Sequence, residues 1–455
     1  MKRGDMSLSG TKMKRSHMLG YGIGSIGSGI FSTVPGMLLL FYMTNALGIP
    51  AELAALAVFV PKMWDVVTDP IIGMISDRTR SRWGRRPYLL VGAILTGLFF
   101  YGLFNVPLYD SVSARFWHVS LLYVLCATGY TIFAIPYIAL PAEMTSDPHE
   151  RTRIVSYRMV FLFVGIIFAG GLSPVVVEYY GGGVAGYGAM SLLLALIIAA
   201  SMMASFFGLK DIKLSDSGTA TFSVASIVNG PLKNPGYLII FGAYALQLGG
   251  FGCLLAGLPY YTTYVLGGGS DQLSIMFLLL NVSAILSIPL WLRFSYRVGK
   301  LKAFKLSGLT LVFSMAILWM FSTPDTVLVV YLMTAIAGVG FAGQQSLGFA
   351  LLPDLVDFDP SGRAPEDVAG VYTGIWVAGE KTGFALGAFF VGTSFGVAGL
   401  VETTEGSVGQ TQLVLETIKF CTALAPALLF ASGLLLMRLV GKSRLAQLTN
   451  PGLAS

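Results

Sequence analysis

Long runs of apolar residues, broken by short polar stretches, extend along the chain from residue 18 to residue 439. A helix of about 20 apolar residues is long enough to cross ~30 Å of hydrocarbon. The runs fall into two sets of six, separated by the longest polar stretch. The pattern therefore predicts twelve membrane helices, at residues 18–46, 52–77, 87–107, 115–141, 155–180, 185–208, 236–266, 272–295, 303–322, 326–352, 369–398 and 412–439.

Composition supports this interpretation. The 455 residues are 55% hydrophobic and only 11% charged, whereas soluble domains carry about 25% charged residues. We therefore expect an all-α, multi-pass membrane protein with an N-terminal six-helix bundle (1–208), a cytoplasmic middle loop (209–235) and a C-terminal six-helix bundle (236–455). The two bundles are expected to be pseudo-symmetric, with helices 1, 4, 7 and 10 lining a central cavity and the helix pairs 2–11 and 5–8 closing its sides.

Basic residues predict the orientation. They gather at the N-terminus, after helix 2, after helix 4, in the middle loop and in the tail, whereas Arg115 is the one clear loop arginine on the other side. By the positive-inside rule both termini are cytoplasmic, in a cell membrane. This bias also accounts for the net charge of +6, so no nucleic-acid partner is expected. We expect a monomer in the lipid bilayer.

Several motifs lose their usual meaning inside membrane helices. Gly22, Gly24 and Gly27 match a dinucleotide fingerprint, but that motif needs a preceding strand, and here the glycines favour close helix packing. The cysteines and histidines show no metal-ligand or nucleophile–base spacing. The sequence therefore predicts neither an enzyme nor a cofactor.

A small set of charged residues lies within the predicted helices. Such residues cost at least a few kcal/mol each and usually face a cavity or one another. They are Lys62, Asp65, Asp69, Arg158, Glu380 and Lys381.

Helix 2 places its charges in one stripe. Lys62, Asp65, Asp69, Gly73 and Asp77 follow i, i+3, i+4 spacing. Counting from Asp77 at the helix end, Asp69 and Asp65 lie about 12 and 18 Å into the membrane. Two carboxylates there need a positive partner, which could be a proton, a small metal cation or a lysine. Alternatively, Lys62 neutralises Asp65 as a purely structural pair.

The stretch WDVVTDPIIGMISDRTRSRWGRRP, Trp64 to Pro87, carries a family resemblance. It resembles the helix 2 and loop signature of the glycoside–pentoside–hexuronide:cation symporters, which have the major facilitator fold. Matches to YTIFAIPYIAL (130–140), LPYYTTYVLG (258–267) and GEKTGFALGAFF (379–390) occur in register. The resemblance implies secondary active transport, with Na⁺ or H⁺ as the coupling ion.

The resemblance also implies a cation site. Asp65 and Asp69 match the family's ion-binding carboxylates, Thr131 matches a threonine ligand, and Thr68 stands where an amide side chain is usual. Carboxylate and hydroxyl oxygens suit a small hard cation. The same carboxylates could instead carry protons, so Na⁺ and H⁺ both stay open.

The substrate side departs from the family pattern. Two aspartates that bind sugar hydroxyls in melibiose permease are replaced by Gly29 and Ala134. The remaining groups suit a sugar-like or anionic small solute, and a lysophospholipid or another amphiphile is the alternative. A receptor that keeps the fold without transport is a third possibility. The candidate substrate-binding residues are Lys62, Tyr130, Arg158, Gln344, Gln345, Trp376, Glu380 and Lys381.

Charges at the cytoplasmic helix ends form a candidate gate. The basic loops of the first half are complementary to the acidic end of helix 10, and several weak pairs could hold the two halves together reversibly. The candidates are Asp77, Arg78, Arg85, Arg86, Glu143, Arg151, Asp354 and Asp357.

Overall fold

A computed structural model describes residues 13–107, 109–145, 147–210, 230–360, 364–404 and 408–438, and its regular elements are helices. In the first half these are α1 (Arg15–Val34), η1 (Pro35–Leu39), α2 (Leu40–Asn45), α3 (Ala51–Trp83), α4 (Arg86–Phe104), α5 (Val112–Met144), α6 (Pro148–Tyr179) and α7 (Gly183–Gly208). In the second half they are η2 (Pro231–Lys233), α9 (Pro235–Tyr260), η3 (Tyr261–Val265), α10 (Ser270–Val298), α11 (Lys300–Met320), η4 (Pro324–Thr326), α12 (Val327–Val356), α13 (Pro365–Ala398), α14 (Gln412–Lys419), η5 (Phe420–Leu424) and α15 (Ala425–Leu436).

The twelve predicted helices are confirmed, once the segments that continue one another are joined. The first predicted helix is α1, η1 and α2 together, the seventh is α9 with η3, and the twelfth is α14, η5 and α15. Most of the middle loop, residues 211–229, lies outside the described residues, so the predicted bundle boundaries stay a prediction.

Two of the predicted helices were too short at their cytoplasmic ends as assigned by the sequence analysis. α3 continues to Trp83 rather than residue 77, and α6 begins at Pro148 rather than residue 155. Apolar patterning marks only the part of a helix that lies in lipid, and both extensions carry the arginines of the polar loops. These helices therefore run on beyond the apolar layer.

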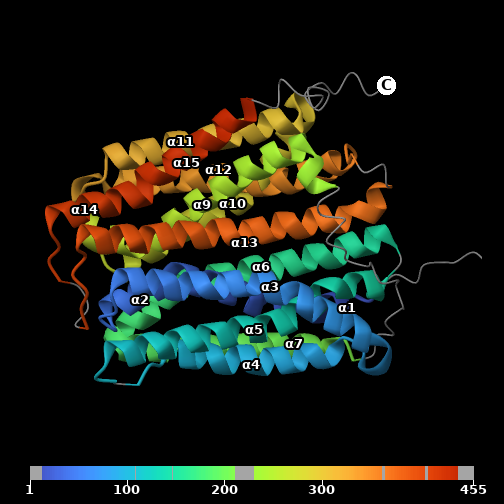
Figure 1. Cartoon of the computed structure of the whole chain (residues 1–455), viewed down its shortest axis with the longest axis horizontal. Coiled ribbons are helices and arrows are strands. Elements are labelled where there is room, and N and C mark those ends of the chain that lie inside the picture. The colour runs from blue at the N-terminus through green and yellow to red at the C-terminus, as the bar shows by residue number, and fades with distance from the viewer. Residues whose placement is uncertain are drawn as a thin grey trace, which may run out of the picture.

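Helices of the two halves form two groups that lie side by side (Figure 1). In the first half α1 packs on α6 and α7, and α4 packs on α5 and α7. In the second half α9 packs on α13 and α15, and α12 packs on α10 and α11. The main contacts between the halves are α3 with α13 and α6 with α10, the predicted 2–11 and 5–8 pairs. These four helices close the sides of the space between the bundles.

Charge distinguishes α3 and α13 from the other long helices. Among the described residues, ten helical segments are long and apolar enough to cross a membrane, and α3 and α13 are not among them. α3 carries Lys62, Asp65 and Asp69, and α13 carries Glu380 and Lys381. These two helices pack against each other, where their charges can meet.

Close backbone contacts join α1 to α6. A Cβ atom added to Gly29 would lie 2.4 Å from the carbonyl oxygen of Leu162, and one added to Gly165 would lie 2.2 Å from that of Ile26. Only glycine allows two helix backbones to approach this closely. The α1–α6 seam is therefore made by glycines on both sides.

Candidate functional site

A cavity of about 370 Å³ lies between the two bundles. Its lining comes from α1, α3, α5 and α6 in the first half and from α9, α10, α12 and α13 in the second. The charged lining residues lie on α3 and α13, whereas α9 and α10 contribute mainly apolar side chains. The polar and charged lining residues are Ser32, Thr33, Lys62, Asp65, Tyr130, Asn281, Gln345, Glu380 and Lys381.

Three of the four candidate cation-binding residues converge beside this cavity, which Asp65 lines. Asp65, only 1% exposed, and Asp69 lie one turn apart on α3. The hydroxyl of Thr131 on α5 donates to Asp69 Oδ1 at 3.0 Å and approaches Asp65 Oδ1 at 3.4 Å. Three oxygen-bearing side chains therefore face a common point, and their binding of a cation stays a prediction.

Lys381 supplies the positive charge between the carboxylates. Its ammonium forms an ion pair with Asp69 and lies 3.9 Å from Asp65 Oδ2. Lys62, the structural partner considered for Asp65, has its ammonium over the rings of Phe31 (5.4 Å) and Tyr123 (6.0 Å). The lysine that bridges the pair thus comes from α13, in the other half of the chain.

Thr68 does not join this cluster directly. Its hydroxyl donates to the backbone carbonyl of Trp64 at 3.0 Å, within its own helix. Threonine side chains in helices commonly form this bond to the preceding turn. The described contacts therefore centre the site on Asp65, Asp69 and Thr131.

Glu380 forms a second polar group in the cavity. Its Oε1 accepts a hydrogen bond from Gln345 Nε2 on α12 at 2.9 Å. The hydroxyl of Tyr244 on α9 donates to Gln345 Oε1 and fixes the amide orientation. Tyr244 was missed in the sequence because a tyrosine in a membrane helix carries no signal of its own.

Gln344 and Trp376, two of the candidate substrate-binding residues, lie outside the cavity lining. Gln344 is 2% exposed, and its Nε2 donates to Phe304 O and Ser307 Oγ on α11. Trp376 is fully buried and stacks on Tyr244 with ring centroids 4.5 Å apart. Both side chains pack within the second bundle, and their contact with a solute stays a prediction.

Arg158 also lies outside the lining. Its guanidinium carbon lies 5.9 Å from the ring centroid of Tyr137. Tyr137 in turn stacks on Tyr21 at 4.4 Å. Arg158 is thereby held against α5 and α1 within the first bundle.

The two positions that lack the family's sugar-binding aspartates have different surroundings. Gly29 lies in the α1–α6 seam, where a side chain would collide with the backbone of α6. Ala134 is 6% exposed on α5. The packing of α1 on α6 therefore leaves no room for a carboxylate side chain at Gly29.

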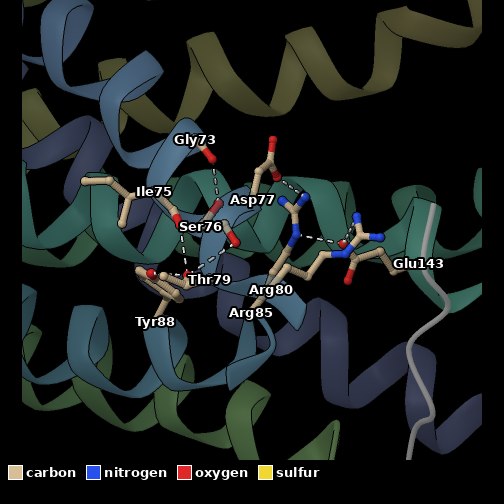
Figure 2. Close-up of polar contacts among 9 residues, drawn as sticks. All are labelled: Gly73, Ile75, Ser76, Asp77, Thr79, Arg80, Arg85, Tyr88 and Glu143. Atoms are coloured by element: carbon tan, nitrogen blue, oxygen red, sulfur yellow. Dashed lines mark hydrogen bonds and ion pairs between the residues drawn. The ribbon is translucent and has the colours of Figure 1, made fainter. Parts of the chain in front are cut away.

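Charged residues at the end of α3 form a cluster within the first bundle (Figure 2). Glu143 on α5, 3% exposed, forms ion pairs with Arg85 (2.7 Å to Nε) and Arg80 (3.4 Å to Nη1). Arg85 also pairs with Asp77. The cluster joins α3 to α5, and Arg80 belongs to it although the predicted gate did not include it.

Other candidate gate residues also bond within their own half. Arg86 donates to the backbone carbonyls of Phe206 and Lys210, and Arg151 donates to those of Thr145 and Ala142. Asp354 pairs with Lys300, whose ammonium lies 2.8 Å from its carboxylate oxygens. Arg78 and Asp357 are exposed. The predicted pairing of Asp354 with first-half arginines is therefore not formed in this conformation.

The opposite end of the molecule, where α3 begins, carries hydrogen bonds between the halves. Thr44 Oγ1 and the hydroxyl of Tyr260 share one at 2.6 Å, and the hydroxyl of Tyr264 donates to Asn45. The backbone N–H of Thr403 donates to Thr44 O at 2.9 Å. We call Thr44, Asn45, Tyr260 and Tyr264 the latch; the sequence analysis missed it because its members are uncharged.

A second bond at the same end involves a carboxylate. Glu178 at the end of α6 accepts from the hydroxyl and the backbone N–H of Ser270, where α10 begins. The backbone N–H of Ala51 similarly donates to Glu402 at 3.0 Å. The two halves are therefore joined at this end by contacts on both sides of the cavity.

Comparisons with known proteins agree with this architecture. Residues 20–441 match the sequence profile of a family described as "MFS/sugar transport protein". The chain is 27% identical to the putative glycoside/cation symporter YagG of Escherichia coli, over 94% of this chain and 92% of the relative. It is 26% identical to a putative sulfoquinovose importer of Salmonella typhimurium (84% and 80% covered). It is also 26% identical to the sodium-dependent lysophosphatidylcholine symporter 1-A of Danio rerio (91% and 84% covered).

The fold itself is shared with solved transporters. A bacterial homolog of the human lysosomal transporter Spinster, solved in an inward-facing and occupied conformation, superposes with a TM-score of 0.70 at 12% identity. The alignment covers 96% of this chain and 98% of that structure. At this identity the likeness shows the fold alone.

Proposed function

The chain belongs to the MFS/sugar transport protein family, a family of transporters and not of enzymes, and from this premise we propose that it is a cation-coupled symporter of a sugar-like or anionic small solute. One observation carries the proposal. The carboxylates of Asp65 and Asp69 and the hydroxyl of Thr131 meet at the wall of a cavity between two helix bundles. A cation there would lie beside a bound solute.

In this proposal Lys381 couples the binding of the cation to the binding of the solute. Its ammonium neutralises Asp69 and also lines the cavity. An anionic group in the cavity would draw the ammonium away from the carboxylates, and Na⁺ or H⁺ would replace its charge there. Cation and solute would then each favour the binding of the other, which is the linkage that symport requires.

The cavity volume supports a small solute. Ligand pockets of about 300–1,000 Å³ hold compounds of drug size, and about 370 Å³ lies near the lower limit. An amphiphile such as a lysophospholipid is the second candidate. It is favoured by the apolar part of the lining, which includes Phe251, Phe277, Phe341 and Phe384.

Orientation follows from the positive-inside rule. Arg80, Arg82 and Arg85 lie at one end of α3, and we assign this end to the cytoplasm. The latch would then lie on the outer face, and both termini would be cytoplasmic. The structure, with its halves joined at the latch, would correspond to a conformation closed to the outside.

Uptake into proteoliposomes tests the proposal. A panel of radiolabelled glycosides, uronides and lysolipids is assayed with and without a Na⁺ or pH gradient. Accumulation of at least one compound is expected to require one gradient, and Asp65→Asn and Asp69→Asn are each expected to abolish accumulation. The exposed Asp325→Asn is the matched control. Gradient-driven accumulation that persists in both cavity variants would refute the proposal.

A further inference from the structure

Two charged groups in the cavity lining, Lys62 and Glu380, are held in no ion pair in the described part of the chain, although Lys62 attracts Asp65 and Lys381 attracts Glu380 at longer range. In the described part of the chain, Lys62 forms no ion pair and its ammonium lies over aromatic rings. Glu380 likewise forms none there and accepts from an amide. Charges in a membrane interior are costly and usually meet a partner or a substrate.

The two groups also face opposite bundles. The contacts of Lys62 are with Phe31 on α1 and Tyr123 on α5, both in the first half. The contact of Glu380 is with Gln345 on α12, which Tyr244 on α9 holds in place, and both belong to the second half. A solute that reached both charges would therefore touch both bundles.

Lys62 and Glu380 would bind chemically different parts of a solute. An ammonium binds carboxylate, phosphate or sulfonate groups as a point charge. A carboxylate beside a fixed amide accepts hydrogen bonds from hydroxyls, while the amide offers a second polar contact. The Tyr244 hydroxyl bond leaves Gln345 little freedom to reorient. Glu380 and Gln345 are thus preorganised to bind a group that carries hydrogen-bond donors.

We propose that Lys62 and Glu380 determine substrate polarity, with Lys62 binding an anionic group of the solute and Glu380, supported by Gln345, accepting hydroxyl donors at its other end. This assignment rests on the proposed function, because it identifies what the same cavity transports. It makes Glu380, at a position next to the bridging Lys381, a substrate-binding residue separate from the cation site.

Binding measurements on the purified full-length protein in nanodiscs test this assignment at a fixed, saturating Na⁺ concentration. The probes are methyl β-D-glucuronide, methyl β-D-glucoside and glycerophosphocholine. The first two differ in whether they carry a carboxylate, and the third carries an anion with a quaternary ammonium. The variants are Lys62→Gln and Glu380→Gln, with Glu380→Asp to restore the charge and the exposed Lys302→Gln as a distant lysine control.

The wild-type protein is expected to bind the glucuronide more tightly than the glucoside. Lys62→Gln is expected to remove this preference, by roughly tenfold as for the loss of a charge-assisted hydrogen bond, and to leave glucoside binding in place. Glu380→Gln is expected to weaken both sugars, and Glu380→Asp to recover part of the binding. Unfolded variants are recognised by the loss of the monodisperse peak in size-exclusion chromatography.

Any of three results overturns the assignment: a preference that survives Lys62→Gln, sugar binding unaffected by Glu380→Gln, or wild-type protein that binds neither sugar. Glycerophosphocholine binding that depends on Glu380, without sugar binding, would identify an ammonium instead of hydroxyls as the donor. Failure of cation-driven uptake in the proteoliposome experiment would refute the proposed symport alone. The binding preferences measured here at equilibrium do not depend on coupling between the cation and the solute.

Discussion

A single ammonium, that of Lys381, lies between the paired carboxylates and the cavity. Two carboxylates one turn apart repel each other in a medium of low polarity unless a positive charge lies between them. In the structure a side chain from the other bundle meets that need. Binding of a coupling cation would therefore be an exchange, in which one positive charge leaves as another arrives.

Lys381→Ala removes the ammonium that would compete with a cation for the carboxylates of Asp65 and Asp69, and it therefore tests this exchange. We expect tighter cation binding, by roughly tenfold or about 1.4 kcal/mol, together with impaired solute accumulation. Sodium-dependent thermal stabilisation measures the first effect, and proteoliposome uptake measures the second. Lys381→Arg keeps the charge and is expected to retain weak cation binding. A variant with unchanged cation affinity would show that the ammonium does not compete.

The clustering of Asp65 and Asp69 could be predicted because the signals of these residues are strong, whereas their binding of a cation stays a proposal. Charges in apolar helices are rare, and the stripe through Asp65 and Asp69 fixes their common face. The substrate side could not be predicted as well. Gln344 and Gln345 are neighbours on a helix that is apolar all round, so no amphipathic face tells which one turns to the cavity. The structure turns Gln345 to it and Gln344 to α11.

At the scale of the helices, the α1–α6 seam sets how closely the elements of the first bundle approach. Gly29 and Gly165 leave no room for a side chain on either helix. Without a hydrophobic driving force in lipid, such close backbone packing is a main source of helix association. We therefore expect α1 and α6 to move together as one unit.

Gly165→Ala tests the seam. The added methyl group would lie against the backbone of α1, which cannot yield as a flexible side chain can. We expect a destabilisation of about 1–3 kcal/mol, typical of overpacking, seen as a lower melting temperature in detergent. Gly374→Ala on α13 has no atom near its added methyl group and is the matched control. Equal melting temperatures of the two variants would contradict this account.

Helix existence followed from the apolar pattern, but interruptions within helices did not. The π-helical turns η1, η3 and η5 lie inside the first, seventh and twelfth predicted helices. Their backbone change adds about one residue to a turn and leaves the apolar composition unaltered. Hydropathy therefore cannot register them. Two of the three, η1 and η3, lie within one or two turns of the latch.

Across the whole molecule, the halves are held together at the latch and by the ion pair of Lys381 with Asp69, whereas the charges at the other end of α3 bond within the first bundle. Alternating access requires contacts that can break. Uncharged hydroxyl pairs meet this requirement, because each contributes only about 1 kcal/mol net. Whether the basic end closes through pairs between halves stays a prediction.

Tyr260→Phe removes one latch bond without altering the ring packing. We expect the population open at the latch end to rise about fivefold, equivalent to ~1 kcal/mol. A cysteine placed by Ser32→Cys in the cavity lining reports this opening through its reaction with an impermeant maleimide added outside. The three native cysteines are buried. Tyr296→Phe, at an exposed position, is the control, and identical labelling rates in the two variants would exclude a latch role.

The crowded environment of Gly29 has a consequence for how this transporter could acquire new substrates. A sugar-binding carboxylate cannot be introduced there by one substitution, because α6 already fills the space. Laboratory evolution toward neutral galactosides is thus expected to bypass this position and accumulate changes on α12 and α13. Saturation mutagenesis with growth selection would locate these changes, and we expect them in the cavity-lining helices of the second half of the chain.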